Sequence, residues 1–218
     1  MVAKERSSLK VFAYAPHNDS WRDHTTAQTF TVDPNQSELA GYLASVLLYA
    51  EGTTITKLPA DQSAIPLTFT HKMARLILNI ETEEDTDDLS FASVTVNNTL
   101  PSCTFKPEDG SLGTATGSPT NITALSALGN STTVYALVIP QKVNKGTILF
   151  TIEKSDKKYT LTLGEDGNFE EGKSYTYTVN VKASPAKDVN ITLTSVPTVS
   201  DWTEVTGETA DAIESQIL

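Results

Sequence analysis

One stretch decides the fold class: Ile65-Pro66-Leu67-Thr68-Phe69-Thr70-His71-Lys72-Met73-Ala74-Arg75-Leu76-Ile77-Leu78-Asn79-Ile80. It is the longest segment with strand character, because apolar and β-branched residues recur through it. Before it, strand patterns are scattered among polar loops. After it, short strands recur at regular spacing up to Trp202. We therefore predict that this stretch is the first strand of the main domain, entered from a linker.

Seven further strands are predicted after this stretch. They are Leu89–Val96, Cys103–Phe105, Thr133–Pro140, Thr147–Glu153, Lys158–Leu163, Lys173–Val181 and Asn190–Thr194. Turn signals separate them, and in the segment Pro107-Glu108-Asp109-Gly110 the glycine accepts a positive φ. Short strands spaced by turns are typical of an antiparallel β-sandwich. We predict an all-β protein of this architecture.

The region before residue 65 contains fewer predicted strands. It offers two strands, Leu9–Ala15 and Gln28–Val32, and a short helix over Ser37–Ala50 with Ser37 as its N-cap. Two strands and a helix cannot close a sandwich. We expect either that this region packs on the following domain or that its missing strands precede Met1. The predicted division is a partial β domain over 1–64, a complete β-sandwich over 65–204 and an acidic tail over 205–218.

Charge and composition exclude several classes of function. The chain has 218 residues, enough for one or two domains, and a net charge of -11. Nucleic-acid binding needs clustered Lys and Arg, so we predict no nucleic-acid partner. Cys103 is the only cysteine, which excludes an intramolecular disulfide and predicts a lone buried thiol. The sequence shows neither a membrane-spanning apolar run nor a signal peptide. It fits a soluble protein or a piece whose export signal is gone.

Candidate residues for chemistry are few. His17 and His24 lie in one polar loop with a spacing that does not fit a helical metal pair, and His71 lies inside an apolar strand. We interpret all three as structural or solvated. The loop Glu81–Asp88 is dense in carboxylates, which calcium favours, but it lacks the EF-hand order. The sequence contains no nucleophile elbow, phosphate loop or dinucleotide fingerprint. We predict no catalytic, cofactor or metal site.

The aromatic residues and the glycosylation sequons carry weaker signals. Trp21 and Trp202 are candidates for a sugar-stacking platform, although Trp202, which follows a terminal strand, is better interpreted as a plug over the end of the core. Asn-x-Ser/Thr sequons occur at Asn18, Asn97, Asn121, Asn130 and Asn190. A Thr-rich chain produces such sequons by chance, so they do not specify a site.

Several landmarks together resemble the fimbrillin-like family of Bacteroidales surface proteins. The most specific is the Phe-Thr-His-Lys-Met-Ala segment at Phe69–Ala74. The others, in matching order, are Val11–Pro16, Tyr42–Ala50, Gly172–Tyr177 and Asp201-Trp202. The resemblance covers about residues 9 to 204. This chain departs from the family pattern because it shows no lipoprotein signal. Cys103 lies too far along the sequence to be the lipid-bearing cysteine.

The resemblance implies two tandem transthyretin-like β-sandwich domains, export as a lipoprotein and assembly by strand donation between subunits. Our leading hypothesis is therefore a non-enzymatic structural or adhesive subunit of a fimbria at the cell surface or outer membrane. Its partners would be other fimbrial subunits or its own copies, together with surface glycans or proteins. The alternative is a carbohydrate-binding cell-surface protein. An enzyme with an unrecognised carboxylate site is the third hypothesis.

Overall fold

The computed structural model describes residues 9–21, 23–55, 66–82, 89, 92–126, 132–182, 186–193, 197–202 and 205–206. These residues form an all-β protein, as the regularly spaced strand patterns predicted. Their helices are α1 (Leu39–Ala44) and the 3-10 turn η1 (Asp19–Trp21). Among the described residues, neither helix has the length and apolarity needed to cross a bilayer.

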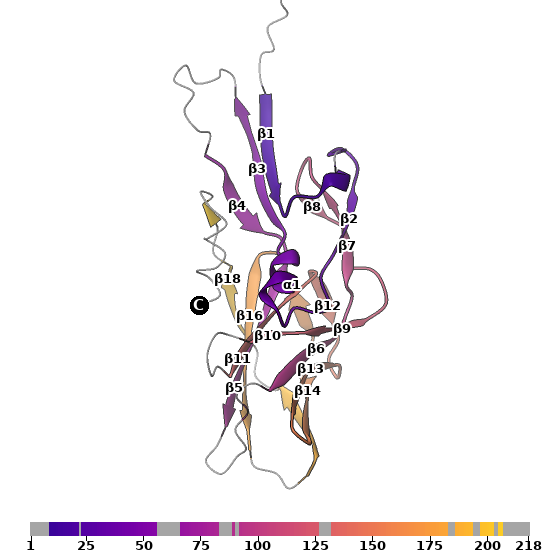
Figure 1. Cartoon of the computed structure of the whole chain (residues 1–218), viewed down its shortest axis with the longest axis vertical. Coiled ribbons are helices and arrows are strands. Elements are labelled where there is room, and N and C mark those ends of the chain that lie inside the picture. Colours follow the sequence, from indigo (N-terminus) through magenta and orange to yellow (C-terminus); the bar gives the residue numbers. More distant parts are fainter. Residues whose placement is uncertain are drawn as a thin grey trace, which may run out of the picture.

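Two small sheets form one end of an elongated molecule (Figure 1). The first, with strand order β1-β3-β4-β19, contains Leu9–Ala15, Leu48–Ile55, Thr68–His71 and Val205–Thr206. The second, with order β2-β7-β8, contains Gln28–Thr31, Ser102–Lys106 and Ser111–Leu112. Strand β7 is thus far from β2 in sequence but pairs with it, and β8 pairs with the other side of β7.

Aromatic rings fill the space between these two sheets. The Phe105 ring on β7 contacts Tyr14 on β1 at 5.9 Å and Tyr49 on β3 at 6.2 Å between centroids. Trp21 lies 5.6 Å from Phe105 and 6.3 Å from Phe30 on β2. These edge-on and tilted contacts are favourable ring geometries, and they join both sheets into one core.

Two five-stranded sheets form the other end. One has the order β10-β11-β5-β16-β18, with strands Leu125–Ser126, Thr133–Val138, Ala74–Thr82, Lys173–Val181 and Thr198–Asp201. The other has the order β17-β14-β13-β6-β9, with strands Asp188–Leu193, Lys157–Leu163, Ile148–Lys154, Ser93–Thr99 and Thr120–Thr123. A short pair, β12 (Gln141–Val143) and β15 (Gly167–Phe169), accompanies them.

Most strand pairs are antiparallel, as predicted, but each five-stranded sheet contains one parallel pair. These pairs are β5 with β16 and β14 with β17. The two sheets contact each other through buried rings, since Phe150 of β13 lies 5.6 Å from Tyr177 of β16. Along β16 the apolar side chains alternate, with Tyr175, Tyr177 and Val179 buried. This period of two is what the sequence pattern of that strand predicted.

The prediction of one strand over residues 65–80 is wrong. The segment forms two strands, β4 and β5, that belong to different sheets. The four consecutive residues His71 to Ala74 are all buried. Successive side chains of one strand face opposite sides, so four buried neighbours mark a place where the chain passes from one sheet to the next. The Lys72 N–H donates to the Leu47 carbonyl at 2.8 Å and holds this crossing.

The predicted helix over Ser37–Ala50 is also too long. Helix α1 has six residues, its N-cap is Glu38, and no side-chain hydrogen bond caps it. The residues Val46 to Ala50 are buried without interruption, and β3 begins at Leu48. A helix on the surface would expose part of each turn, so this buried run takes the extended form instead.

Gln36 fastens the segment before α1 to a five-stranded sheet. Its side chain is fully buried, and its Nε2 donates to the Leu137 carbonyl at 2.9 Å. Its Oε1 accepts from the Leu137 N–H at 2.8 Å. The amide thus satisfies both backbone groups of Leu137, as a neighbouring strand would.

Candidate functional site

Strand β1 is the longest edge strand in the described part of the chain. It pairs with β3 on one side, and no described strand pairs with its other side. Its residues Val11 to Ala15 are half-buried, and Lys10 is its one charged residue. Natural proteins usually protect edges with charges, prolines or short strands, because an open edge exposes unpaired N–H and C=O groups. The β1 edge is therefore a candidate surface for strand addition.

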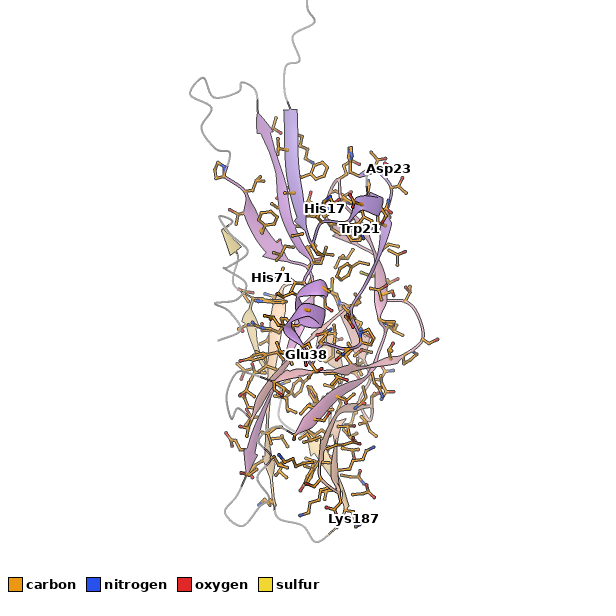
Figure 2. All side chains as sticks on the ribbon, in the orientation of Figure 1. His17, Trp21, Asp23, Glu38, His71 and Lys187 are labelled. Carbon is orange, nitrogen blue, oxygen red and sulfur yellow. The ribbon has the colours of Figure 1, made fainter. Side chains whose placement is uncertain are left out.

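An open hollow of about 410 Å³ lies beside β1 at this end of the molecule. We call it the terminal hollow. Figure 2 shows His17, Trp21 and Asp23 together at this end, while Lys187 lies at the opposite end. The lining residues are Phe12, Tyr14, His17, Asn18, Asp19, Trp21 and His24.

Local hydrogen bonds fix the loop that forms the terminal hollow. The Asn18 Oδ1 accepts from the Ser20 N–H at 3.0 Å, and the Trp21 N–H donates to the Asn18 carbonyl at 3.0 Å. The Tyr14 hydroxyl donates to the Trp21 carbonyl at 3.4 Å. These bonds form an Asx turn followed by η1, so the walls of the hollow are preformed.

The other side of the loop is fixed by Asp23. Its carboxylate accepts from the hydroxyl groups of Thr25 and Thr26, each at 2.6 Å. These bonds stabilise the charged form and lower the pKa of Asp23 to about 2, the Thr25 hydroxyl contributing most. The Glu108 N–H donates to the His24 carbonyl at 3.0 Å and ties the loop to the β7–β8 turn.

A second cluster lies at the crossing between β4 and β5. The His71 ring stacks on the Trp202 ring with centroids 3.5 Å apart and planes 4° apart. The Arg75 guanidinium lies 4.8 Å from the Trp202 ring centroid, and Arg75 Nε donates to Ser174 Oγ at 3.0 Å. His71 and Trp202 are both buried. The stack therefore joins the crossing between β4 and β5 to the segment that follows β18.

A polar hollow of about 480 Å³ lies between β3, β4 and the β7–β8 turn. Several of its side chains are engaged within the protein. Lys72 forms an ion pair with Glu171 and lies 5.8 Å from the Tyr49 ring centroid. Thr70 Oγ1 donates to the Tyr49 carbonyl at 3.2 Å. We interpret these groups as structural.

An apolar groove of about 180 Å³ opens between the edges of β17 and β18. Leu193 and Val199 contribute from these two strands, and Tyr175 and Tyr177 of β16 also line the groove. Val199 is 50% exposed, the highest value among the large apolar residues described. At its rim Asp166 forms a 2.6 Å ion pair with Lys142, which lowers the pKa of the Asp166 carboxyl.

The structure places the predicted histidines as follows. His17 and His24 line the same hollow, and His17 Nε2 lies 3.9 Å from Asp19 Oδ1. The described residues contain no group of three or more His, Cys, Asp or Glu side chains that could hold a metal ion. His71 lies in the ring stack. Of the acidic loop, residues 83–88 fall outside the described residues, so calcium binding there stays a hypothesis.

The alternative of a sugar platform built on Trp21 and Trp202 is wrong, whereas the burial of Trp202 agrees with its interpretation as a plug over the end of the core. Trp21 is 5% exposed and Trp202 is 6% exposed, so neither presents a free ring face.

Cys103 is the buried free thiol that was predicted, and its burial raises the pKa of the thiol to about 11. Asn97 is buried and donates to Thr151 Oγ1 at 2.9 Å, which makes that sequon structural. The Asn130 sequon lies outside the described residues.

Sequence reasoning missed the terminal hollow. It recognised the two histidines but not Phe12 and Tyr14, which come from β1. A signal was present, because residues two apart on a strand face the same side, and Phe12 and Tyr14 are such a pair. What the sequence did not show is that this face meets the His17–His24 loop.

Comparisons with known proteins identify relatives of this chain. Residues 3–202 match the family described as fimbrillin-like. No curated protein sequence matches the chain. A Bacteroides uniformis structure is similar with a TM-score of 0.66 and 20% identity, over 88% of this chain and 72% of its own. A Bacteroides ovatus structure has a TM-score of 0.64 and 17% identity, over 94% and 69%.

A third structure, from Bacteroides thetaiotaomicron, has a TM-score of 0.51 and 18% identity, over 82% of this chain and 66% of its own. All three proteins carry the provisional name of cell adhesion protein. At these identities the likeness shows that the fold is shared.

Proposed function

The chain belongs to the fimbrillin-like family, and on that premise we propose that it is a non-enzymatic structural or adhesive subunit of a bacterial surface fimbria. The family match over residues 3–202 is the observation that carries the proposal. The provisional names of the similar Bacteroides structures agree with it.

We propose that assembly uses strand addition at the outer edge of β1. An added strand would pair with backbone groups that the described strands leave open, and main-chain hydrogen bonds of this kind provide affinity in β-augmentation. Three properties of β1 support this route: its seven residues, its half-buried apolar side chains and its single charge. The partner is another fimbrial subunit or a second copy of this chain.

We also propose two β-sandwich units of the transthyretin-like type. The crossing at Lys72-Met73 supports a boundary there, slightly later than the boundary at residue 64 that the sequence suggested. The pairing of β2 with β7 supports the assignment of β7 and β8 to the first unit. Location at the cell surface or outer membrane follows from the family and is part of the same proposal.

Peptide binding tests strand addition. A fluorescent peptide with the sequence of Glu208–Leu218 is titrated with the chain, and its anisotropy is compared with that of a scrambled peptide. Sedimentation velocity over a range of concentrations measures self-association in parallel. The proposal predicts binding of the native peptide or concentration-dependent assembly. If neither occurs, assembly by strand donation is wrong.

Two adjacent proline variants locate the binding edge. Successive N–H groups of a strand point to opposite edges, so one of Lys10→Pro and Val11→Pro removes a donor that faces β3 and the other removes an outward donor. The outward variant should keep its unfolding temperature but weaken peptide binding about fivefold or more, the value of one lost hydrogen bond. Lys10→Ala and Val11→Ala are the matched controls. Unchanged peptide affinity in both proline variants would place the binding site elsewhere.

A further inference from the structure

We propose that the terminal hollow binds a neutral sugar ring. This inference goes beyond assembly, because it concerns side chains beside β1 rather than the backbone edge of that strand. It also differs from the tryptophan platform considered above, since the partly exposed aromatic rings are those of Phe12 and Tyr14. The proposal assigns a recognition site for a glycan to one end of the molecule.

The size and lining of the hollow suit a small ligand. Its volume of about 410 Å³ lies within the range of roughly 300–1,000 Å³ typical of small-molecule sites. Such sites combine aromatic walls with a few polar groups. Here the half-buried rings of Phe12 and Tyr14 form an apolar wall, while the exposed His17 and Asp19 provide polar groups.

The aromatic wall is held in place by its neighbours. The Phe12 ring lies 5.5 Å from the His24 ring, and the Tyr14 ring lies 5.5 Å from the Trp21 ring, centroid to centroid. Trp21 belongs to this loop, and its buried side chain anchors the loop to the aromatic core. Because these rings are already fixed, a ligand would not have to order them on binding, which lowers the entropic cost.

The charge of the site favours a neutral ligand. None of the described residues that line the hollow is a lysine or arginine, and the chain has a net charge of -11. An anionic ligand would therefore be repelled. The Asp19 carboxylate accepts hydrogen bonds, and an imidazole both accepts and donates them. Sugar hydroxyl groups match this set, and the C–H face of a sugar ring packs on an aromatic ring as other apolar surfaces do.

Tryptophan fluorescence provides a direct assay. The chain has two tryptophans, so Trp202→Phe leaves Trp21 as the single emitter, directly at the hollow. Galactose, mannose, fucose and N-acetylglucosamine are titrated one by one, with sialic acid as an acidic probe and choline as a cationic probe. The proposal predicts that at least one neutral sugar changes the emission of Trp21 in a saturable way.

Two exposed substitutions connect the signal to the hollow. Asp19→Asn and His17→Ala change side chains that are 85% and 82% exposed, so the fold should persist, which circular dichroism verifies. Asp19→Asn should weaken sugar binding about tenfold, as expected for the loss of a charge-assisted hydrogen bond. Asp188→Asn, an exposed carboxylate on β17, is the matched control and should bind normally.

The proposal is overturned if no neutral sugar binds, if only sialic acid or choline binds, or if both hollow variants bind as well as the control. Saturation-transfer NMR with the same sugars provides an independent readout, because it does not depend on tryptophan. Self-association of the same samples is measured in parallel. If the chain with an unaltered hollow binds no neutral sugar but assembles normally, this inference alone is contradicted and the fimbrial proposal stays intact.

Discussion

Gly110 couples the two small sheets, and its replacement by alanine tests that coupling. The residue ends the β7–β8 turn with a φ of +70°, and the aromatic ring of Tyr49 on β3 lies directly against it. A Cβ added at Gly110 would lie 2.3 Å from Tyr49 Cδ1. Contact at this distance forces the ring or the turn to move. Since Tyr49 also contacts Phe105, the displacement would reach the aromatic core.

Two costs add at this position. The left-handed conformation costs an L-residue about 1–2 kcal/mol relative to glycine. Overpacking a filled site costs about 1–3 kcal/mol more. We therefore expect Gly110→Ala to lower the free energy of unfolding by about 2–5 kcal/mol, a large part of the stability of an ordinary domain.

Gly146→Ala is the matched control. Gly146 has a φ of +82°, and a Cβ built there meets no atom within 4 Å. It should show only the conformational cost of about 1–2 kcal/mol. Urea unfolding followed by circular dichroism measures both variants by linear extrapolation. Equal losses in the two variants would show that Tyr49 does not pack against Gly110 and would refute the proposed coupling.

Three other predictions concern separate parts of the molecule. Gln36→Ala should lower the free energy of unfolding by about 2–4 kcal/mol, because it removes two hydrogen bonds and leaves both backbone groups of Leu137 buried and unpaired. Urea unfolding measures this loss. A loss no larger than that of an exposed substitution would show that the Gln36–Leu137 hydrogen bonds do not stabilise the fold. Hydrogen bonds from Ser111 lower the pKa of Asp109 from 3.8 to about 2, so the stability that this carboxylate contributes is present above about pH 3.8 and is lost as the pH falls toward 2. Asp109→Asn should flatten that part of an acid-unfolding curve, and an unchanged curve would show that the turn bonds do not contribute. The Cys103 thiol, buried and with a pKa raised to about 11, should not react with a thiol reagent near pH 8 until urea unfolds the chain; fast reaction of the native protein would contradict its burial.

Local sequence patterns predicted many elements correctly. The alternation over Lys173–Val181 corresponds to β16 at both ends, because period-two burial is encoded in neighbouring residues. The segment Pro107–Gly110 forms a turn with a positive φ at its glycine, and the turn between β13 and β14 contains Ser155 at a φ of 55°. These features depend on a few adjacent residues, so the sequence expresses them directly.

Features that depend on distant residues were not predicted. The segment around His71 is continuous in pattern but crosses between sheets, and the burial that marks the crossing comes from partners such as Trp202. The helix pattern near Tyr42 ends early because the residues from Leu48 onward pair with β1 and β4. The parallel pairs have no local signal either, since their strands are separated by long stretches of chain.

The candidate site was predictable only in part. The sequence placed His17 and His24 in one loop, and the structure confirms that they line one hollow. The aromatic wall from β1 required knowledge of how that strand faces the loop. The two tryptophans are large enough to stack on a sugar ring, but large aromatic side chains are more often buried than exposed. Both are buried here.

Amide hydrogen exchange of β1 tests the proposed assembly most directly. In the isolated subunit, the N–H groups of Leu9–Ala15 that face away from β3 should exchange quickly, while those bonded to β3 are protected. On peptide binding or fibre formation, the outward N–H groups should become protected, and the central strand β13 should keep its exchange rates as an internal reference. If the outward N–H groups of β1 exchange equally fast before and after assembly, strand addition at this edge is contradicted.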